Sequence, residues 1–297
     1  MIRDFISDYL SVFEKKDTIS CPICNEEFSI ENPSNVPQGL TKEHVPPHSL
    51  GGQIRCYTCV DCNNRTGSSI DYELYKGIKF NRKTFFQNLN NQKFRVHNGN
   101  NEVFQGTATS NKDGTLQLTH SNKNNHKDKL KLFVNNHINP GNLLYLKPIV
   151  PKIDIHLFRV GLLKSAYLLL FSKIGYRLLK QNNFNIIRDQ IMNPALKLYY
   201  DEAYMFDVFN KEQRGIYYCN LEGQTAVIVV MNLFLGKEVF TFGVFFPDPD
   251  SNQILLNFIS HKIALLNFKL SLEKSAFLNS ISIKKLCDRL TLKFTKL

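Results

Sequence analysis

The sequence predicts an α+β protein, in which a small cysteine-stabilised module precedes a larger domain of helices and antiparallel strands. Three observations lead to this prediction. Two Cys-x-x-Cys pairs lie in the first quarter of the chain, a long apolar segment with helical spacing lies beyond its midpoint, and two β-branched and aromatic runs joined by a short turn follow. The 297 residues suffice for two domains with a substantial core.

Composition narrows the class of protein. A hydrophobic fraction of 43% is typical of globular proteins and excludes wholesale disorder. The net charge of +11 favours a polyanionic partner such as nucleic acid. An odd number of cysteines, 7, with metal-type spacing is typical of a reducing compartment. With no signal-peptide pattern at the start, we expect a cytoplasmic protein.

The first predicted segment, residues 1–78, contains the cysteine pairs. Apolar residues recur at helical spacing between Ile2 and Phe13 and predict an opening helix. Ser68 and Ser69 favour the start of a short helix over residues 70–76, which Gly77 would end.

The second predicted segment, residues 79–150, is rich in Asn and Lys. Alternating runs predict strands over residues 93–97 and 115–119, with turns at Asn98-Gly99 and Asp113-Gly114. Between residues 76 and 131 there are 11 Lys and Arg residues against 3 acidic ones. Such a charged sheet is either an ordinary solvated face or a surface that grips phosphates.

The third predicted segment, residues 151–297, follows a boundary at Pro148 and Pro151. Two helices are predicted first, over residues 155–180 and 185–193. A buried hairpin follows, with strands over 225–235 and 239–246 joined by Gly236-Lys237. The last predicted elements are a strand over 254–259 and one or two helices from residue 261. Four basic residues interrupt the apolar stretch 157–179, so we expect a buried core helix and no membrane span.

The cysteine spacing indicates metal binding. The pairs Cys21–Cys24 and Cys59–Cys62 have the ligand count and spacing of a closed tetrahedral zinc site. Cys56 lies near the second pair, and we interpret it as a small buried residue. The pairs bracket Glu43 and His44, and Asn63 directly follows the last cysteine, an arrangement that suggests a scaffold for a second, catalytic metal.

An acid, a histidine and an amide suit attack on a phosphodiester. A divalent ion on oxygen or imidazole ligands can stabilise charge at the phosphate and at the leaving oxygen. A neutral histidine can take the proton from water. Since neighbouring residues on a strand point to opposite faces, Glu43 and His44 need a bend to reach one site, and Pro46-Pro47 could provide it.

Four motifs in this order resemble the zinc-bound HNH endonucleases. They are Cys21-Pro22-Ile23-Cys24, Glu43-His44-Val45-Pro46, Gly51-Gly52 and Cys59-Val60-Asp61-Cys62-Asn63. The resemblance covers roughly residues 20–77 and implies a ββα-metal fold, in which a β-hairpin packs on a helix. One departure is that the family's middle Asn is absent, and Thr58 or Gln53 stands near its place.

The resemblance also implies residue roles. His44 would be the general base, and Glu43 and Asn63 would bind a catalytic Mg²⁺ or Mn²⁺, with Asn64 as an alternative ligand. The four cysteines would hold a structural zinc. Arg65 and His48 are candidate contacts to nucleic acid, although a solvated arginine and a plain loop histidine are equally compatible with the sequence.

The implied function is metal-dependent hydrolysis of DNA, with RNA as an alternative substrate and bacterial or phage DNA defence as the setting by analogy. Residues 151–297 would select the substrate, bind a protein partner or gate the nuclease. Two alternatives stay open. One is a catalytically silent, zinc-containing nucleic-acid-binding protein, and the other is an effector nuclease that a partner or small ligand triggers.

Overall fold

The computed structural model describes residues 18–30, 37–80, 89, 91–97, 103–111, 113–120, 125–137, 145–179, 181–206, 209–221 and 224–247. Its described part mixes helices and antiparallel sheets, as the α+β prediction requires. The described parts of residues 1–75 and 154–297 form one compact unit, and those of residues 76–153 form a second. The first and third segments distinguished in the sequence therefore fold together.

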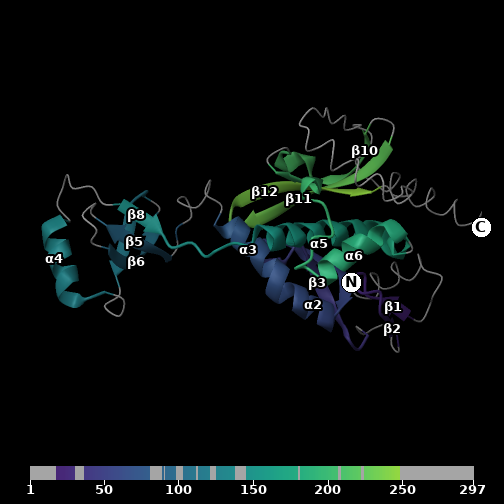
Figure 1. Ribbon diagram of the computed structural model, residues 1–297, viewed down its shortest axis with the longest axis horizontal. Coiled ribbons are helices and arrows are strands. Elements are labelled where there is room, and N and C mark those ends of the chain that lie inside the picture. The colour runs from purple at the N-terminus through teal and green to yellow at the C-terminus, as the bar shows by residue number, and fades with distance from the viewer. Residues whose placement is uncertain are drawn as a thin grey trace, which may run out of the picture. The chain divides into compact units, whose positions relative to one another are not determined.

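The cysteine-bearing part of the first unit consists of two small hairpins and a helix (Figure 1). Strand β1 (Thr18–Ser20) pairs with β2 (Glu27–Ser29), and β3 (Leu40–Val45) pairs with β4 (Gln53–Cys59), both antiparallel. The 3₁₀ turn η1 (His48–Leu50) lies inside the second hairpin. Helix α2 (Val60–Thr66), the π-turn η2 (Gly67–Asp71) and α3 (Tyr72–Lys79) then follow without interruption.

The helix predicted over residues 70–76 is therefore part of a longer helical stretch. It begins at Val60 because Cys59 caps it: the Cys59 thiol accepts the backbone N–H of Cys62 at 3.3 Å. Gly77 lies inside α3 and does not end it.

The later part of the first unit consists of helices and one antiparallel sheet. Helix α5 (Ile155–Ile174) leads through η3 (Gly175–Leu178) and η4 (Asn182–Phe184) to α6 (Asn185–Met192). Short turns η5 (Asp201–Ala203) and η6 (Lys211–Gln213) flank β9 (Tyr204–Phe206). The sheet order is β10 (Gly215–Leu221), β11 (Gln224–Leu235), β12 (Glu238–Pro247), β9.

Both predicted helices and the predicted hairpin of this segment are confirmed. Helix α5 ends before residue 180, because Gly175 takes a positive φ of 72° that terminates it. The turn between β11 and β12 lies at Gly236, where φ is 61°. Strands β9 and β10 were not predicted.

Helix α5 lies between the sheet and the cysteine-bearing hairpins (Figure 1). The Tyr167 hydroxyl donates to the Pro22 carbonyl at 2.6 Å, and the Tyr176 hydroxyl donates to the Ser20 carbonyl at 2.7 Å. A Cβ on Gly161 would lie 2.8 Å from the Ile70 carbonyl oxygen, so only glycine allows α5 to approach this closely. The first and last thirds of the chain thus share one core.

The length and composition of α5 would also suit a membrane span. However, 67% of its most apolar 18-residue window is buried inside the protein, as in the core helix of a soluble protein. This agrees with the predicted core helix.

The second unit is a four-stranded antiparallel sheet with one helix. Its order is β7 (Leu116–His120), β6 (Val103–Ser110), β5 (Gln92–His97), β8 (Tyr145–Pro148), and the helix is α4 (Lys127–His137). Strands β5 and β7 and the Asp113-Gly114 turn are confirmed, while β6, β8 and α4 were missed. The apolar side of the sheet packs on α4 through Phe104, Leu130 and Phe133.

The two ends of this second unit lie close to each other. The Lys76 ammonium donates to the Lys152 carbonyl at 3.2 Å. Just outside the unit, the Asp154 N–H donates to the Glu73 carboxylate at 3.1 Å. The chain therefore leaves and re-enters the first unit at one place.

Four predictions lie outside the described residues. They are the opening helix, the Asn98-Gly99 turn, the strand over 254–259 and the helices from residue 261.

Candidate functional site

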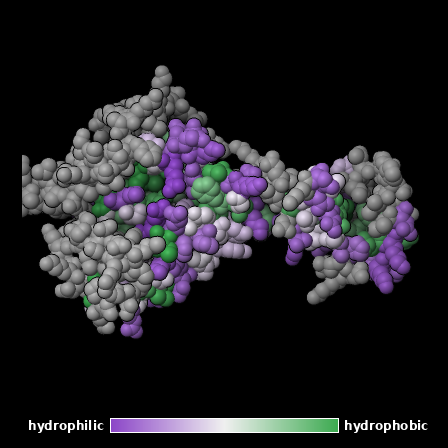
Figure 2. Space-filling model, turned by 180° about the vertical axis from the view of Figure 1, so that it is seen from behind, coloured by the Kyte–Doolittle hydropathy of each residue, from purple (hydrophilic) through white to green (hydrophobic). Residues whose placement is uncertain are grey.

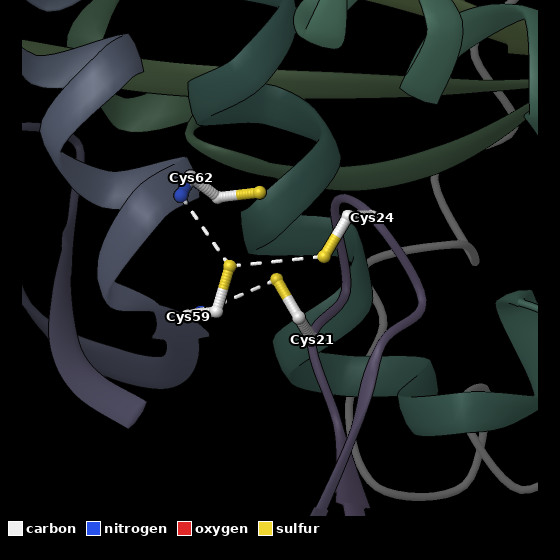
Figure 3. A group of neighbouring side chains, drawn as sticks. All are labelled: Cys21, Cys24, Cys59 and Cys62. Atoms are coloured by element: carbon white, nitrogen blue, oxygen red, sulfur yellow. Dashed lines mark hydrogen bonds between the residues drawn. The ribbon is translucent and has the colours of Figure 1, made fainter. Parts of the chain in front are cut away.

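The four paired cysteines form a compact cluster. The sulfurs of Cys21, Cys24, Cys59 and Cys62 all lie within 4.8 Å of one another and point toward a common centre (Figure 3). The Cys24 and Cys59 sulfurs are 3.7 Å apart. Tetrahedral zinc with Zn–S bonds of about 2.3 Å separates its sulfurs by about 3.8 Å, so the cluster fits a zinc ion.

Each cysteine pair lies on a tight turn of the backbone. In the first pair, between β1 and β2, the Asn25 N–H donates to the Cys21 carbonyl at 2.8 Å, and Asn25 adopts a φ of 64°. The second pair spans the end of β4 and the first turn of α2. The Cys59 N–H donates to the Cys21 sulfur at 3.3 Å, which links the two pairs and favours a thiolate.

The charge state of the cluster depends on whether a cation is bound. A hydrogen bond from Cys62 lowers the pKa of Cys21 to about 5, whereas burial raises the pKa of Cys24 to about 12. The hydrogen bond with Cys21 also raises the pKa of Cys62. Without a metal the buried sulfurs share little negative charge, and zinc would allow all four to ionise.

Within the part of the chain that the structure describes, these cysteines are the only group of three or more His, Cys, Asp or Glu side chains placed to hold a metal ion. Cys56 is separate from them: it is fully buried, and burial raises the pKa of its thiol.

Helix α6 covers one side of the cluster. The Met192 sulfur lies 3.7 Å from the Cys62 sulfur and 2.9 Å from Nη2 of Arg65. Arg65, a candidate phosphate contact, is exposed and lies beside this methionine.

Glu43 is part of a buried charge cluster. Its carboxylate is 3% exposed and lies 2.8 Å from the ammonium of Lys164, on α5. The same ammonium lies 2.6 Å from Oδ2 of Asp71. The Thr58 hydroxyl donates to Glu43 at 3.1 Å. Both oxygens of Glu43 therefore have partners.

This cluster holds two carboxylates and one ammonium in a nearly dry environment. Burial raises the pKa of Asp71, although Lys164 lowers it. Burial alone would lower the pKa of Lys164, but Asp71 and Glu43 raise it above its usual value and keep the ammonium charged. Oδ1 of Asp71 is buried and has no hydrogen-bond partner. With both carboxylates ionised, one negative charge would be left over.

His44 lies beside this cluster. The pairing of β3 with β4 shifts register between Glu43 and His44, before Pro46-Pro47, where the sequence predicted a bend. His44 is partly exposed, and its ring meets that of the exposed His48 edge-on, with centroids 5.0 Å apart.

Asn63 is partly exposed on the first turns of α2, and Asn64 is exposed. Among these described residues, no hydrogen bond or ion pair joins Asn63 to Glu43 or His44. Glu43 is held from the side of α5, whereas His44 lies beside His48.

Sequence reasoning missed Lys164 and Asp71. The only feature of the sequence that could have pointed to Lys164 is that it is a cation inside an apolar run. Asp71 resembled an ordinary acid at the start of a helix. Only the fold brings these two residues, 93 positions apart, into contact.

The Gly51-Gly52 pair has a steric explanation. Gly51 adopts a φ of 79° after η1. A Cβ on Gly52 would lie 1.4 Å from the Pro46 carbonyl oxygen, a backbone atom that cannot move without reshaping the hairpin. The two glycines therefore allow the loop to fold back against the Pro46 backbone.

Replacing Gly52 by Ala should lower the free energy of unfolding by about 3 kcal/mol, the upper range for overpacking. Urea denaturation measures this. Gly67→Ala is the matched control, because Gly67 is helical and a Cβ there meets nothing within 4 Å. We expect it to be neutral or to stabilise by about 0.5 kcal/mol. Equal stability of the two variants would contradict the steric explanation.

The chain matches no protein-family model, no curated protein and no solved structure. What is shown is an α+β protein with a candidate structural zinc site near its N-terminus.

Proposed function

We propose that this protein is a metal-dependent endonuclease of the HNH type that hydrolyses DNA phosphodiester bonds. The observation that carries the proposal is the arrangement around the cysteine cluster. A β-hairpin, β3–β4, is followed directly by helix α2, and the cluster clamps their junction. His44 lies on the hairpin and Asn63 on the helix, which are the positions that the resemblance implies for a ββα-metal site.

His44 has the exposure that a general base needs. It is partly accessible, so water can approach its ring, whereas Glu43 behind it is buried. In the proposed reaction His44 takes a proton from water, and the resulting nucleophile attacks phosphorus while the bond from phosphorus to the leaving ester oxygen breaks; that oxygen then takes up a proton. The steric fit of Gly52 behind Pro46 holds the loop after His44 in place.

The proposed catalytic ion, Mg²⁺ or Mn²⁺, would supply charge stabilisation at the phosphate and at the leaving oxygen. Glu43 and Asn63 would hold it. The negative charge that Lys164 leaves uncompensated, and the unpaired Oδ1 of Asp71, favour a cation on this side of β3. Lys164 and Asp71 act as positioning residues, because they fix the carboxylate of Glu43.

Cleavage of supercoiled plasmid tests the proposal. We expect nicking or linearisation with Mg²⁺ or Mn²⁺, none with EDTA, and a loss of about 10²–10⁴-fold in His44→Ala, the usual contribution of a general base. His126→Ala is the matched control, because His126 is exposed on the second unit and has no assigned role. Equal cleavage by the two variants would refute His44 as the base.

One observation favours the catalytically silent alternative. Both oxygens of Glu43 already have partners, Lys164 and Thr58, and the family's middle Asn is absent. A folded, zinc-loaded protein that binds DNA but cuts none with any divalent ion would support a binding function.

A cavity favours the triggered-effector alternative. It measures about 410 Å³, and the cationic side chains of Arg55, Lys173 and Arg214 line it over an apolar floor. The Nε of Arg55 is buried and has no partner. The volume and charge suit a small anionic ligand, and the cavity joins β4 to α5 and to the sheet. Plasmid cleavage that requires such a ligand would support this alternative.

A further inference from the structure

We propose that the solvent-facing side of the sheet in the second unit docks duplex DNA, through a row of cationic and hydroxyl side chains. The inference rests on the proposed function, because it assumes that the partner is DNA. The inference goes beyond the proposed function because it assigns substrate binding to a unit separate from the one that contains the candidate nuclease site.

Strand alternation separates the two sides of the sheet. On β5, Phe94 is fully buried and Val96 packs against the apolar cluster under α4. Lys93, Arg95 and His97 alternate with these residues and therefore project from the opposite face.

The pairing register extends this face across the sheet. Arg95 lies opposite Lys147 of β8 and Gln105 of β6, and Lys93 lies opposite Thr107, which in turn pairs with Thr119 of β7. Lys93, Arg95 and Lys147 are all exposed. We call this set, with Gln105, Thr107 and Thr119, the outer face.

The charge of the outer face is of one sign. No Asp or Glu occurs in β5, β6, β7 or β8. Arg95 and Lys147 are direct cross-strand neighbours, and like charges in such positions destabilise a sheet. An anion bound between them removes that repulsion, so the outer face is complementary to a phosphate backbone.

A small hollow on the outer face adds hydrogen-bond donors. It has a volume of about 120 Å³, and Lys93, Gln105, Thr107 and Thr119 contribute to its lining. The hydroxyls of Thr107 and Thr119 are 2.6 Å apart. Lysine, hydroxyl and amide groups are the usual protein contacts to DNA phosphates, which makes the hollow a phosphate position.

The arrangement of aromatic rings on this face favours a duplex over a single strand. Single strands bind on exposed aromatic platforms, whereas the rings of His97 and Tyr145 at this sheet are stacked on each other, with centroids 5.1 Å apart. The exposed Lys and Arg side chains of β5 and β8 can instead contact the phosphate backbone of a duplex. In Figure 2 the described residues of this unit are hydrophilic at its margins, with apolar residues between them.

Fluorescence anisotropy with a labelled DNA duplex tests the inference. The protein is the full chain carrying His44→Ala, without divalent ions, so that no cleavage interferes. We expect Lys93→Ala/Arg95→Ala/Lys147→Ala to weaken binding at least about tenfold. The salt slope should fall by about 0.9 for each phosphate that the variant no longer neutralises.

Lys127→Ala/Lys129→Ala/Lys131→Ala is the matched control. It removes the same charge from exposed positions of α4, on the other side of the sheet. Circular dichroism verifies that both variants are folded. Equal weakening in the two, unchanged binding in the outer-face variant, no binding by the parent protein, or stronger binding of single-stranded DNA or RNA would overturn the inference.

The outcome is distinguishable from failure of the proposed nuclease. If DNA binding depends on the outer face but no metal condition gives plasmid cleavage, the docking inference stands and the proposed nuclease function is refuted. If cleavage depends on His44 but binding does not depend on the outer face, the nuclease function stands and the docking inference is refuted.

Discussion

Cys59→Ser is expected to release the metal and unfold the cysteine-bearing hairpins. Structural zinc contributes apparent binding free energies of about 10–16 kcal/mol in small zinc modules. The hairpins here are two-stranded and short, and such hairpins are marginal alone. In Cys59→Ser the backbone N–H that donates to the Cys21 sulfur remains, and a serine hydroxyl can still cap α2, so the substitution removes chiefly the thiolate ligand.

Elemental analysis and thermal unfolding with and without a chelator measure this effect. We expect one zinc ion per chain, its loss in Cys59→Ser, and a chelator-induced fall in the melting temperature of the parent protein. Cys56→Ala is the matched control, because Cys56 is buried outside the cluster. The Cys56→Ala protein should therefore keep its zinc ion. A Cys59→Ser protein with zinc and an unchanged melting temperature would contradict the zinc assignment.

Lys164→Met is expected to lower the free energy of unfolding by about 3–5 kcal/mol, the cost of leaving a buried charge without its partner. The Lys164 side chain is 2% exposed, and its ammonium forms ion pairs with both Glu43 and Asp71. Since these two carboxylates raise the pKa of Lys164, its stabilisation is complete below the usual lysine pKa. The stabilisation by the Lys164 ammonium disappears only as the pH rises through the folded-state pKa of Lys164. The difference in free energy of unfolding between the parent protein and Lys164→Met should therefore be constant around neutral pH.

Urea denaturation of a mutant cycle separates the charge effect from packing. Adding Glu43→Gln and Asp71→Asn to Lys164→Met should recover part of the stability, because no carboxylate is then left unpaired. Lys173→Met on the exposed side of the same helix should change stability by no more than about 0.5 kcal/mol. Additive effects of the three substitutions would show that the charges do not interact.

The sequence predicted those parts of the fold that depend on local patterns. The apolar periodicity of α5 and the β-branched runs of β11 and β12 are strong, and these elements lie close to the predicted ranges. Strand β6 was missed because Gly and Thr weaken its apolar alternation. Helix α4 was missed because Lys and Asn residues obscure its helical apolar spacing. The cysteine cluster was predictable because ligand spacing alone specifies it.

The environment of Glu43 could not be predicted from the sequence. Its burial depends on α5 crossing behind β3, where two segments far apart in the chain meet. For the same reason, local patterns could not reveal that the first and third segments fold together. The hydrogen bonds of Tyr167 and Tyr176, in the third segment, reach carbonyls of the first.

The adjoining ends of the second unit make it a replaceable cassette. Because Glu73 and Asp154 are already bonded where the chain departs and returns, a short linker could bridge them without opening the shared core. Such a cassette can change or be lost in evolution while the host continues to fold. The proposed binding of DNA by the outer face can then vary independently of the cysteine-bearing hairpins and α5.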